Sequence, residues 1–379
     1  MNFTQNLRIL SQSIKLNDKI ETGQNPGGGK MKAGVVHATN DIRYEEIDKP
    51  KAEPGKVVVK VKYTGICGSD IPRVNADACH FFPNVLGHEF SGVVDEVGEG
   101  VTSVKKGDRV AGVPLVPCLK CPDCQRGDYS LCKHYSFIGS REFGSFAEYV
   151  SMPELNVVKF GDDVSFEKGA FFEPATVALH GLRRVDYKSG KNVAILGGGT
   201  VGLLTAQWAR IFGAKSVTVF DIIDERLDLA KRLGATHGIN SSKEGFMDEA
   251  MAITNGAGFD YVYETAGNTI TMKMAFELAA NKAGVCFIGT PTRELSFTVK
   301  EWENINRKEF NLTGSWMSYS APFPGDEWEL TAHYFGTGDL KFDDSFIFKK
   351  IPLSKIDEAF EMFKTPGLVK GKILIDSEA

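Results

Sequence analysis

Four cysteines lie close together in the sequence, at Cys118, Cys121, Cys124 and Cys132, while the other three stand apart. Their spacing, Cys-x2-Cys-x2-Cys-x7-Cys, supplies four thiolates from one loop, and four sulfurs complete a tetrahedral shell with no open position. In a reducing compartment such a cluster is more often a metal site than a set of disulfides. The cluster therefore predicts a structural zinc site, and an iron–sulfur cluster, which also uses cysteine ligands, is the alternative.

A second set of candidate metal ligands is dispersed over three segments, Gly65-Ile-Cys67, Leu86-Gly-His88-Glu89 and Phe172-Glu173-Pro174. One thiolate, one imidazole and one or two carboxylates form a mixed set that can leave a coordination position for water or substrate. An open position is typical of a catalytic zinc ion. The two sets together predict two zinc ions per chain, one structural and one catalytic.

A third group of residues predicts a dinucleotide site. The segment Gly197-Gly-Gly199-Thr200-Val201-Gly202 follows an apolar strand-like run and opens a helical one. In this context the first glycine permits a tight turn, the second lets the backbone approach a pyrophosphate at the helix N-terminus, and the third lets helix and strand pack closely. We therefore expect this loop to bind the coenzyme.

The preferred coenzyme is predicted from Asp221, which ends the next strand-like run. A carboxylate at this spacing accepts hydrogen bonds from the hydroxyls of the adenosine ribose and repels a 2′-phosphate. The sequence therefore favours NAD over NADP. Arg226 is close enough in sequence to contact the same part of the coenzyme.

The elements that must position these groups change in character along the chain. Residues 31 to about 170 contain short β-like runs at 57–63, 90–97, 109–113 and 145–150, which predict a mainly β domain. From about residue 190, strands at 193–196, 216–220, 261–264 and 285–289 alternate with helical runs through Arg210 and over 225–233. This alternation predicts a parallel sheet. A helix at 355–364 and a last strand at 371–375 are expected near the C-terminus.

Residues 1–30 differ from the rest, because a weakly amphipathic run leads into a glycine-rich linker. We interpret them as an added or upstream leader, with a targeting or oligomerisation arm as the alternative.

The chain has 44 Lys and Arg against 49 Asp and Glu, a net charge of −5, with the charges interspersed. This balance makes nucleic acid and anionic membranes poor candidate partners. The start of the chain has no secretory signal pattern, so we expect a cytoplasmic protein.

The motifs together resemble those of the zinc-dependent medium-chain dehydrogenases, the alcohol and polyol dehydrogenase family, from Met31 to the C-terminus. The resemblance implies an α/β protein: a GroES-like β-barrel catalytic domain (31–173 and 316–379) with a structural-zinc lobe, plus a Rossmann NAD-binding domain (174–315). It also implies that Cys67, His88 and Glu173 are the main catalytic-zinc ligands, with Glu89 as a ligand or near neighbour. A homodimer or homotetramer is expected.

The resemblance implies roles in proton transfer as well. Ser69 matches the hydroxyl relay between the alcohol and the nicotinamide ribose, and Asp70 is expected to orient the His88 imidazole. Pro72 occupies the position at which many alcohol dehydrogenases carry a relay histidine. We therefore expect Glu89 at the outer end of the proton path, with His80 as an alternative.

Four segments resemble the branch of the family that oxidises hexitol phosphates: 67–73, 80–90, 137–141 and 314–320, the last continuing to Trp328. This implies a polyol phosphate substrate, galactitol 1-phosphate, oxidised to tagatose 6-phosphate with hydride transfer to NAD. Arg73 and Arg141 are the expected phosphate contacts, helped by the segment from Trp316 to Tyr319, although either arginine could be an ordinary surface residue. Unphosphorylated sorbitol, xylitol, butanediol or threonine is the alternative substrate. A zinc-free quinone reductase is disfavoured, because the zinc-ligand set is complete. A non-catalytic NAD sensor is disfavoured, because Ser69 and all the ligands are present.

Overall fold

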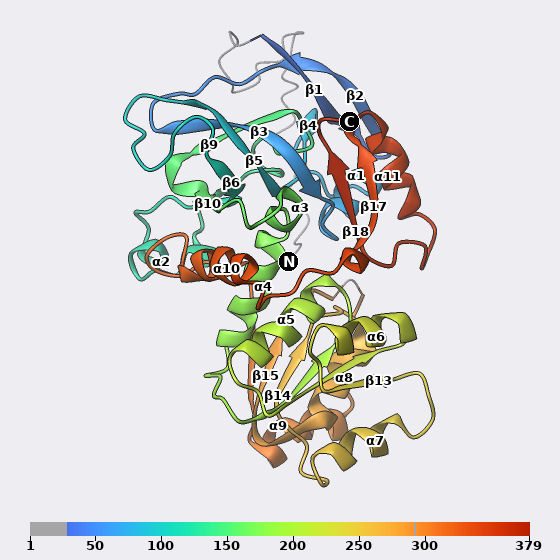
Figure 1. The fold of residues 1–379 in the computed structure, drawn as a ribbon. Coiled ribbons are helices and arrows are strands. Elements are labelled where there is room, and N and C mark those ends of the chain that lie inside the picture. Colours follow the sequence, from blue (N-terminus) through green and yellow to red (C-terminus); the bar gives the residue numbers. More distant parts are fainter. Residues whose placement is uncertain (1–28, 292) are drawn as a thin grey trace, which may run out of the picture.

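The computed structural model describes residues 29–291 and 293–379, which form two parts that meet at the helix α4 (Phe172–Arg183) (Figure 1). Residues 1–28 of the predicted leader lie outside the described residues. Lys30 already belongs to the first strand, so regular structure starts inside the predicted leader boundary.

The first part consists mainly of β-strands and contains both ends of the described chain. Its main sheet has the order β10-β6-β5-β3-β18-β17, with β9 also paired to β3, and smaller sheets have the orders β2-β1-β4 and β7-β8. Its strands are β1 (Lys30–Ala38), β2 (Asp41–Asp48), β3 (Lys56–Gly65), β4 (Asn84–Val85), β5 (Glu89–Val97), β6 (Arg109–Gly112), β7 (Leu115–Val116), β8 (Ser136–Phe137), β9 (Tyr149–Pro153), β10 (Val157–Lys159), β17 (Ile347–Pro352) and β18 (Lys372–Asp376). Its helices are α1 (Asp70–Asn75), α2 (Pro122–Gln125), α3 (Phe166–Gly169), α10 (Asp326–Thr337) and α11 (Ile356–Met362).

The strand β3 is central because its valines are buried. Val57, Val58, Val59 and Val61 have no exposed surface, which suits a strand covered on both faces. The C-terminal strand β18 pairs antiparallel with β3, with Leu374 opposite Gly65. This pairing brings the end of the chain beside the turn that carries Cys67.

The strand predicted over 145–150 is wrong at its start, because β9 begins at Tyr149. Ser145 and Phe146 donate backbone hydrogen bonds to Gly87 and Leu86, whereas Glu148 bonds to Lys32. The segment is thus divided between different partners and forms no continuous ladder. Its hydrophobic residues reflect burial without regular pairing.

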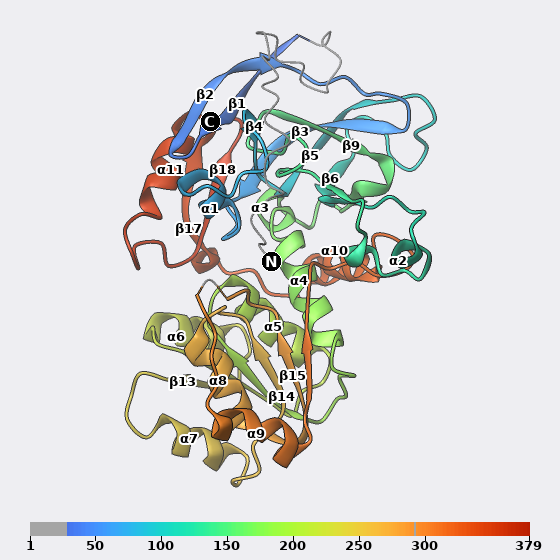
Figure 2. The ribbon, with the colours of Figure 1, turned by 180° about the vertical axis from the view of Figure 1, so that it is seen from behind.

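The second part is a parallel sheet in the order β13-β12-β11-β14-β15-β16. Its strands and helices are β11 (Asn192–Leu196), α5 (Thr200–Ile211), β12 (Ser216–Asp221), α6 (Asp224–Arg232), β13 (His237–Asn240), α7 (Phe246–Ile253), β14 (Phe259–Glu264), α8 (Thr269–Leu278), β15 (Ala279–Phe287), α9 (Val299–Lys308) and β16 (Asn311–Gly314). Val193 and Ile195 pack on the face covered by α5 and α6, while Ala194 and Leu196 pack on the face covered by α8 (Figure 2). The order reverses between β11 and β14, and in such sheets ligands bind in the crevice at this switch point.

The helix α4 shares its core with both parts. Phe172 stacks on Phe335 of α10 with ring centroids 5.8 Å apart, and Trp208 of α5 donates its indole N–H to the Ala175 carbonyl at 2.9 Å. The start of α4 therefore has a fixed position between the two sheets.

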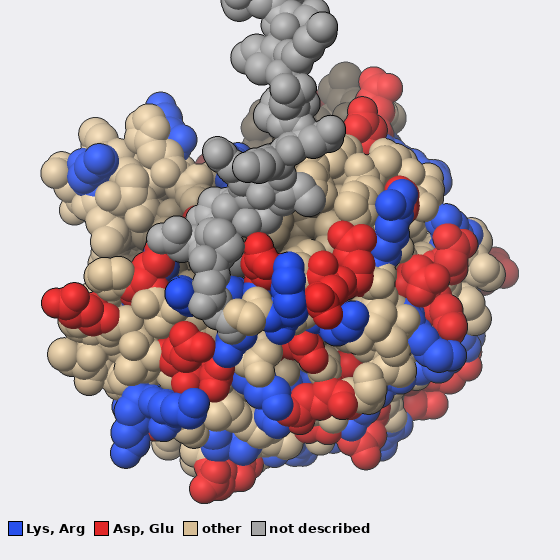
Figure 3. All heavy atoms as spheres, turned by 90° about the horizontal axis from the view of Figure 1, so that it is seen from above, with Lys and Arg blue, Asp and Glu red and all other residues tan. Residues whose placement is uncertain are grey.

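Charges of both signs are interspersed over the surface seen from above (Figure 3). Among the residues that the structure describes, no helix is both long and apolar enough to cross a membrane.

Candidate active site

The four clustered cysteines come together around the short helix α2, as a metal site requires. Their sulfurs all lie within 4.8 Å of one another, and Cys121 Sγ is 3.5 Å from Cys124 Sγ and 3.8 Å from Cys132 Sγ. Zinc–sulfur bonds of 2.3 Å in a tetrahedron place sulfurs about 3.8 Å apart. The backbone N–H of Lys120, with further hydrogen bonds, lowers the pKa of Cys118 to about 6, whereas burial raises the pKa of Cys124 to about 12. The cluster fits a closed zinc shell.

Replacing Cys121 by serine is expected to lower the melting temperature by roughly 10 °C and to remove one zinc ion per chain, because a structural zinc site contributes folding energy directly. The folded fraction should keep its activity. Cys79→Ser is the matched control, since Cys79 lies outside the cluster. Metal analysis, thermal melts and assays test this; unchanged zinc content in the Cys121 variant would contradict it.

A second convergence joins Cys67, His88 and Glu89, whose potential ligand atoms also lie within 4.8 Å of one another. Cys67 follows β3, and His88 and Glu89 stand at the start of β5, which pairs with β3 through Gly65 and Glu89. His88 and Glu89 are buried. Burial disfavours a charged imidazole, yet the negative charges of Asp70 and Cys67 raise the pKa of His88 well above its usual value. This surplus of negative charge suits a cation.

Asp70 lies directly behind His88. Its Oδ1 is 3.4 Å from His88 Nδ1, and its Oδ2 accepts the Cys67 backbone N–H at 3.0 Å. With Nδ1 on the Asp70 side, His88 Nε2 is available to a metal. Asp70 therefore contacts two of the candidate ligand residues, as its predicted positioning role requires.

Glu173 lies on the first turn of α4, outside the group of three converging ligand atoms. It still belongs to the same electrostatic cluster. Burial raises the pKa of Glu173 to about 7, with a lowering contribution from His88 and a raising one from Glu89. The structure thus brings Glu89 into the ligand group and leaves Glu173 at its edge, the reverse of the expected ranking.

Lys372 is a functional-site residue that the sequence reasoning missed. It begins β18, and its Nζ lies 2.8 Å from Glu89 Oε1 and 2.6 Å from Oε2. A Cβ on Gly65 would lie 2.4 Å from Glu89 Oε2, so the glycine makes room for this pair. Burial opposes the ammonium charge, but Glu89 and Cys67 raise the pKa of Lys372. A lysine directly before the apolar run Ile373-Leu-Ile375 was the only sequence signal.

The predicted proton relay has a free first member. Ser69 is exposed and precedes α1, yet its side chain makes no capping hydrogen bond. Its hydroxyl is therefore available to a substrate and to solvent. Glu89, expected at the outer end of the path, is buried and ion-paired with Lys372, which favours a role in holding the metal site.

The glycine loop has the geometry of a phosphate-binding turn. Gly197 has φ of +106°, and a Cβ on Gly202 would lie 1.9 Å from the Gly197 carbonyl oxygen. Nothing lies within 4 Å of a Cβ placed on Gly199, so the backbone there is open to a ligand. Thr200 and Val201 form the first turn of α5, whose N-terminus has no side-chain cap. Its free N–H groups suit a pyrophosphate.

Asp221 is held at the end of β12 beside this loop. Its Oδ2 accepts the Gly198 N–H at 2.7 Å, and its Oδ1 accepts the Ile223 N–H at 2.9 Å. Arg226 Nη1 lies 3.5 Å from the same Oδ2. The carboxylate is thus oriented by the backbone, with the guanidinium as its neighbour.

Replacing Asp221 by serine is expected to reduce the preference for NAD over NADP about tenfold or more, because a carboxylate repels the 2′-phosphate. The ratio of kcat/KM for the two coenzymes measures this preference. Asp224→Ser removes a nearby exposed acid and should leave the ratio unchanged. Equal kcat/KM of the native protein with both coenzymes would contradict the assignment.

The predicted substrate contacts differ in exposure: some lie at the surface, and one is buried in the protein core. Arg141 is exposed, with its guanidinium 4.4 Å from the Tyr135 ring centroid, and Arg73 donates to the Ser69 carbonyl at 2.7 Å. Trp316 is 54% exposed. Tyr319 differs, because it is buried and its hydroxyl accepts the Leu115 N–H at 3.2 Å. Tyr319 therefore packs in the core, which contradicts its predicted role as a substrate contact.

Comparison with known families identifies the class. Residues 53–162 match the family described as "Alcohol dehydrogenase GroES-like domain", and residues 200–332 match "Zinc-binding dehydrogenase". The chain belongs to the zinc-dependent medium-chain dehydrogenases and is an alcohol or polyol dehydrogenase, an oxidoreductase with zinc and NAD as cofactors. The predicted GroES-like plus Rossmann fold is confirmed.

Individual relatives include polyol and polyol phosphate dehydrogenases. The chain is 43% identical over 303 residues to galactitol 1-phosphate 5-dehydrogenase of Escherichia coli strain K12, covering 80% of this chain and 88% of the relative. It is 36% identical over 268 residues to sorbitol dehydrogenase of Bacillus subtilis, covering 69% and 76%. The crystal structure of galactitol-1-phosphate dehydrogenase from Escherichia coli superposes with a TM-score of 0.86 at 39% identity, covering 91% of this chain and 100% of that one.

Proposed function

We propose that this protein oxidises a polyol phosphate, galactitol 1-phosphate, at a secondary carbon to give tagatose 6-phosphate. Two electrons and one hydrogen leave carbon as a hydride to NAD, and the hydroxyl proton is released. The observation that carries the phosphate assignment is a pair of guanidinium groups, Arg73 and Arg141, beside the neutral His80 imidazole. Arg73 Nη1 also lies 3.9 Å from Asp70 Oδ1. Burial and the charges of Arg141 and Arg73 lower the pKa of His80, so both guanidinium groups lie within electrostatic range of one imidazole.

Two contacts fix the loops that carry these groups. Asn84 Nδ2 donates to the Ser140 carbonyl at 3.0 Å, and Phe81 stacks on Phe143 with centroids 6.4 Å apart. The His80 and Arg141 loops are therefore joined. A phosphate dianion is a ligand that two guanidinium groups favour, because they bind it through paired N–H donors.

The chain's own residues provide the positioning. When bound, zinc polarises the substrate hydroxyl and NAD accepts the hydride. Cys67, His88, Glu89 and Glu173 would hold the metal, with Asp70 orienting His88 and Lys372 balancing the charge of Glu89. Ser69 relays the hydroxyl proton to solvent, because its side chain is exposed and makes no capping hydrogen bond.

An NAD-reduction panel of phosphorylated and free polyols, run with metal analysis, tests the function. Galactitol 1-phosphate should be the best substrate. If sorbitol, butanediol or threonine were oxidised with higher kcat/KM than the phosphate ester, the alternative substrates would take its place.

Assembly, location and domain limits are part of the proposal. We expect a cytoplasmic homodimer or homotetramer, in which residues 31–173 and 316–379 form the catalytic domain and 174–315 the coenzyme domain. Among the described residues, the strand β16 forms one edge of the parallel sheet and is largely exposed, so this edge is open to a second copy. A monomer in sedimentation experiments at micromolar concentration would refute the oligomer.

A further inference from the structure

Glu264 is a buried carboxylate that the proposed mechanism does not use. It is the last residue of β14 and has no exposed surface. The described residues include no cation paired with it; its partners are neutral donors. Ala266 N–H donates to Oε1 at 3.0 Å, Gly267 N–H donates to Oε2 at 3.2 Å, and the Thr271 hydroxyl lies 2.7 Å from Oε1.

The same residue also binds a second loop through its backbone. The Glu264 carbonyl accepts the Ile288 N–H at 2.8 Å and the Gly289 N–H at 2.9 Å. A Cβ on Gly289 would lie 2.2 Å from the Gly267 nitrogen and 2.6 Å from Glu264 Oε2. The loops after β14 and β15 therefore touch through their backbones, and Glu264 fixes both.

These loops lie at the carboxyl edge of the parallel sheet, beside the glycine loop. Thr265 Oγ1 is 2.9 Å from the Leu196 carbonyl oxygen and 3.1 Å from that of Gly197. The switch point lies between β11 and β14, and a dinucleotide binds across such a crevice. Asp221 at the end of β12 is expected to bind the adenosine half of the coenzyme. The nicotinamide half is then expected on the other side of the crevice, beside β14 and β15.

We propose that Glu264 is a positioning residue that holds the loops after β14 and β15 in the shape that receives the nicotinamide half of the coenzyme. Burial raises the pKa of the Glu264 carboxyl group, whereas its hydrogen bonds lower it. These hydrogen bonds offset the free-energy cost of burying the carboxylate charge. A carboxylate suits the position because both oxygens must accept. A glutamine would turn its amide N–H groups toward one of the donors.

The test compares NADH with ADP-ribose, which lacks the nicotinamide, by calorimetric titration of the zinc-loaded protein without substrate. Glu264→Gln should weaken NADH binding about tenfold, since it removes a charge-assisted hydrogen bond, and should leave ADP-ribose binding within about twofold. KM for NAD should rise in parallel. Equal weakening of both ligands, or no weakening of NADH, would overturn the proposal.

Tyr263→Phe is the matched control. Tyr263 precedes Glu264 on β14 but is buried on the opposite face, where its hydroxyl donates to the Leu182 carbonyl at 3.0 Å. It should lower stability without changing the ratio of the two affinities. If Glu264→Gln does not fold, Thr271→Val removes one donor only and should weaken NADH selectively by about threefold; an unchanged ratio there would equally overturn the proposal.

Discussion

Replacing Cys67 by serine is expected to lower kcat/KM by about four orders of magnitude and to leave the fold intact. We propose the Cys67 thiolate as a metal ligand in the open site, and a neutral hydroxyl binds zinc far more weakly. The fold should survive because the turn is held by the backbone N–H of Cys67, which donates to Asp70 and does not involve the sulfur. Activity assays, metal analysis and thermal melts together measure this.

The zinc content should fall from about two to about one per chain in this variant, because the cysteine cluster is separate. Cys79→Ser is again the control, since Cys79 is a half-buried thiol outside both ligand groups. NADH binding should persist in the Cys67 variant. Full activity with a single zinc ion per chain in the native protein would contradict the assignment of two separable sites.

Free galactitol is expected to be oxidised with a kcat/KM about 10³-fold below that of galactitol 1-phosphate. Hydrogen bonds to a charged group contribute about 1.5–3 kcal/mol each, and two arginines together account for roughly 4 kcal/mol. Binding energy from a group remote from the reacting carbon can lower the barrier at that carbon. The discrimination should therefore include kcat as well as KM.

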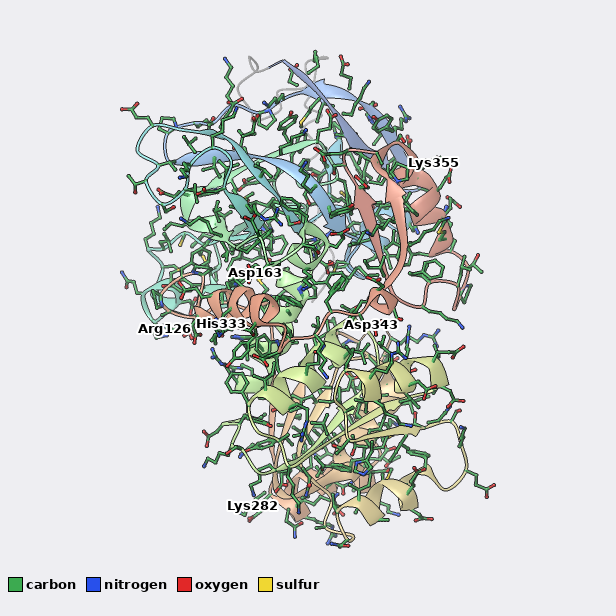
Figure 4. All side chains as sticks on the ribbon, in the orientation of Figure 1. Arg126, Asp163, Lys282, His333, Asp343 and Lys355 are labelled. Atoms are coloured by element: carbon green, nitrogen blue, oxygen red, sulfur yellow. The ribbon has the colours of Figure 1, made fainter. Side chains whose placement is uncertain are left out.

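Arg141→Met provides the sharper test, because Arg73 also bonds to the Ser69 carbonyl and its loss would disturb the relay. The variant should lose about 30-fold in kcat/KM for the phosphate ester and nothing for free galactitol. Arg126→Met is the matched control, since Arg126 lies on the outer side of the zinc lobe and pairs with Asp123 and Asp128 (Figure 4). Similar kcat/KM for galactitol and its phosphate in the native protein would remove the phosphate assignment.

The sequence was most informative where function depends on neighbours along the chain. The cysteine cluster lies within one loop, and the glycine motif lies between one strand and one helix, so their spacing alone restricts their geometry. The strands at 193–196 and 216–220 were predicted closely for a related reason, because buried parallel strands are rich in apolar and β-branched residues, and Ser216 and Thr218 are the exceptions in these two runs. The strand predicted at 145–150 was wrong at its start, because a buried hydrophobic segment need not be paired as a strand.

The tertiary structure decided what depends on distant segments. Lys372 is 283 residues from Glu89 and meets it only because β18 pairs with β3. Tyr319 was expected at the rim, yet the core accommodates its ring and the Leu115 backbone bonds its hydroxyl. Glu264 looks like an ordinary strand end in the sequence, but two loops supply its hydrogen-bond donors. Local spacing determines which ligand types are near one another, whereas strand pairing and loop packing determine which charges are buried together and must be balanced.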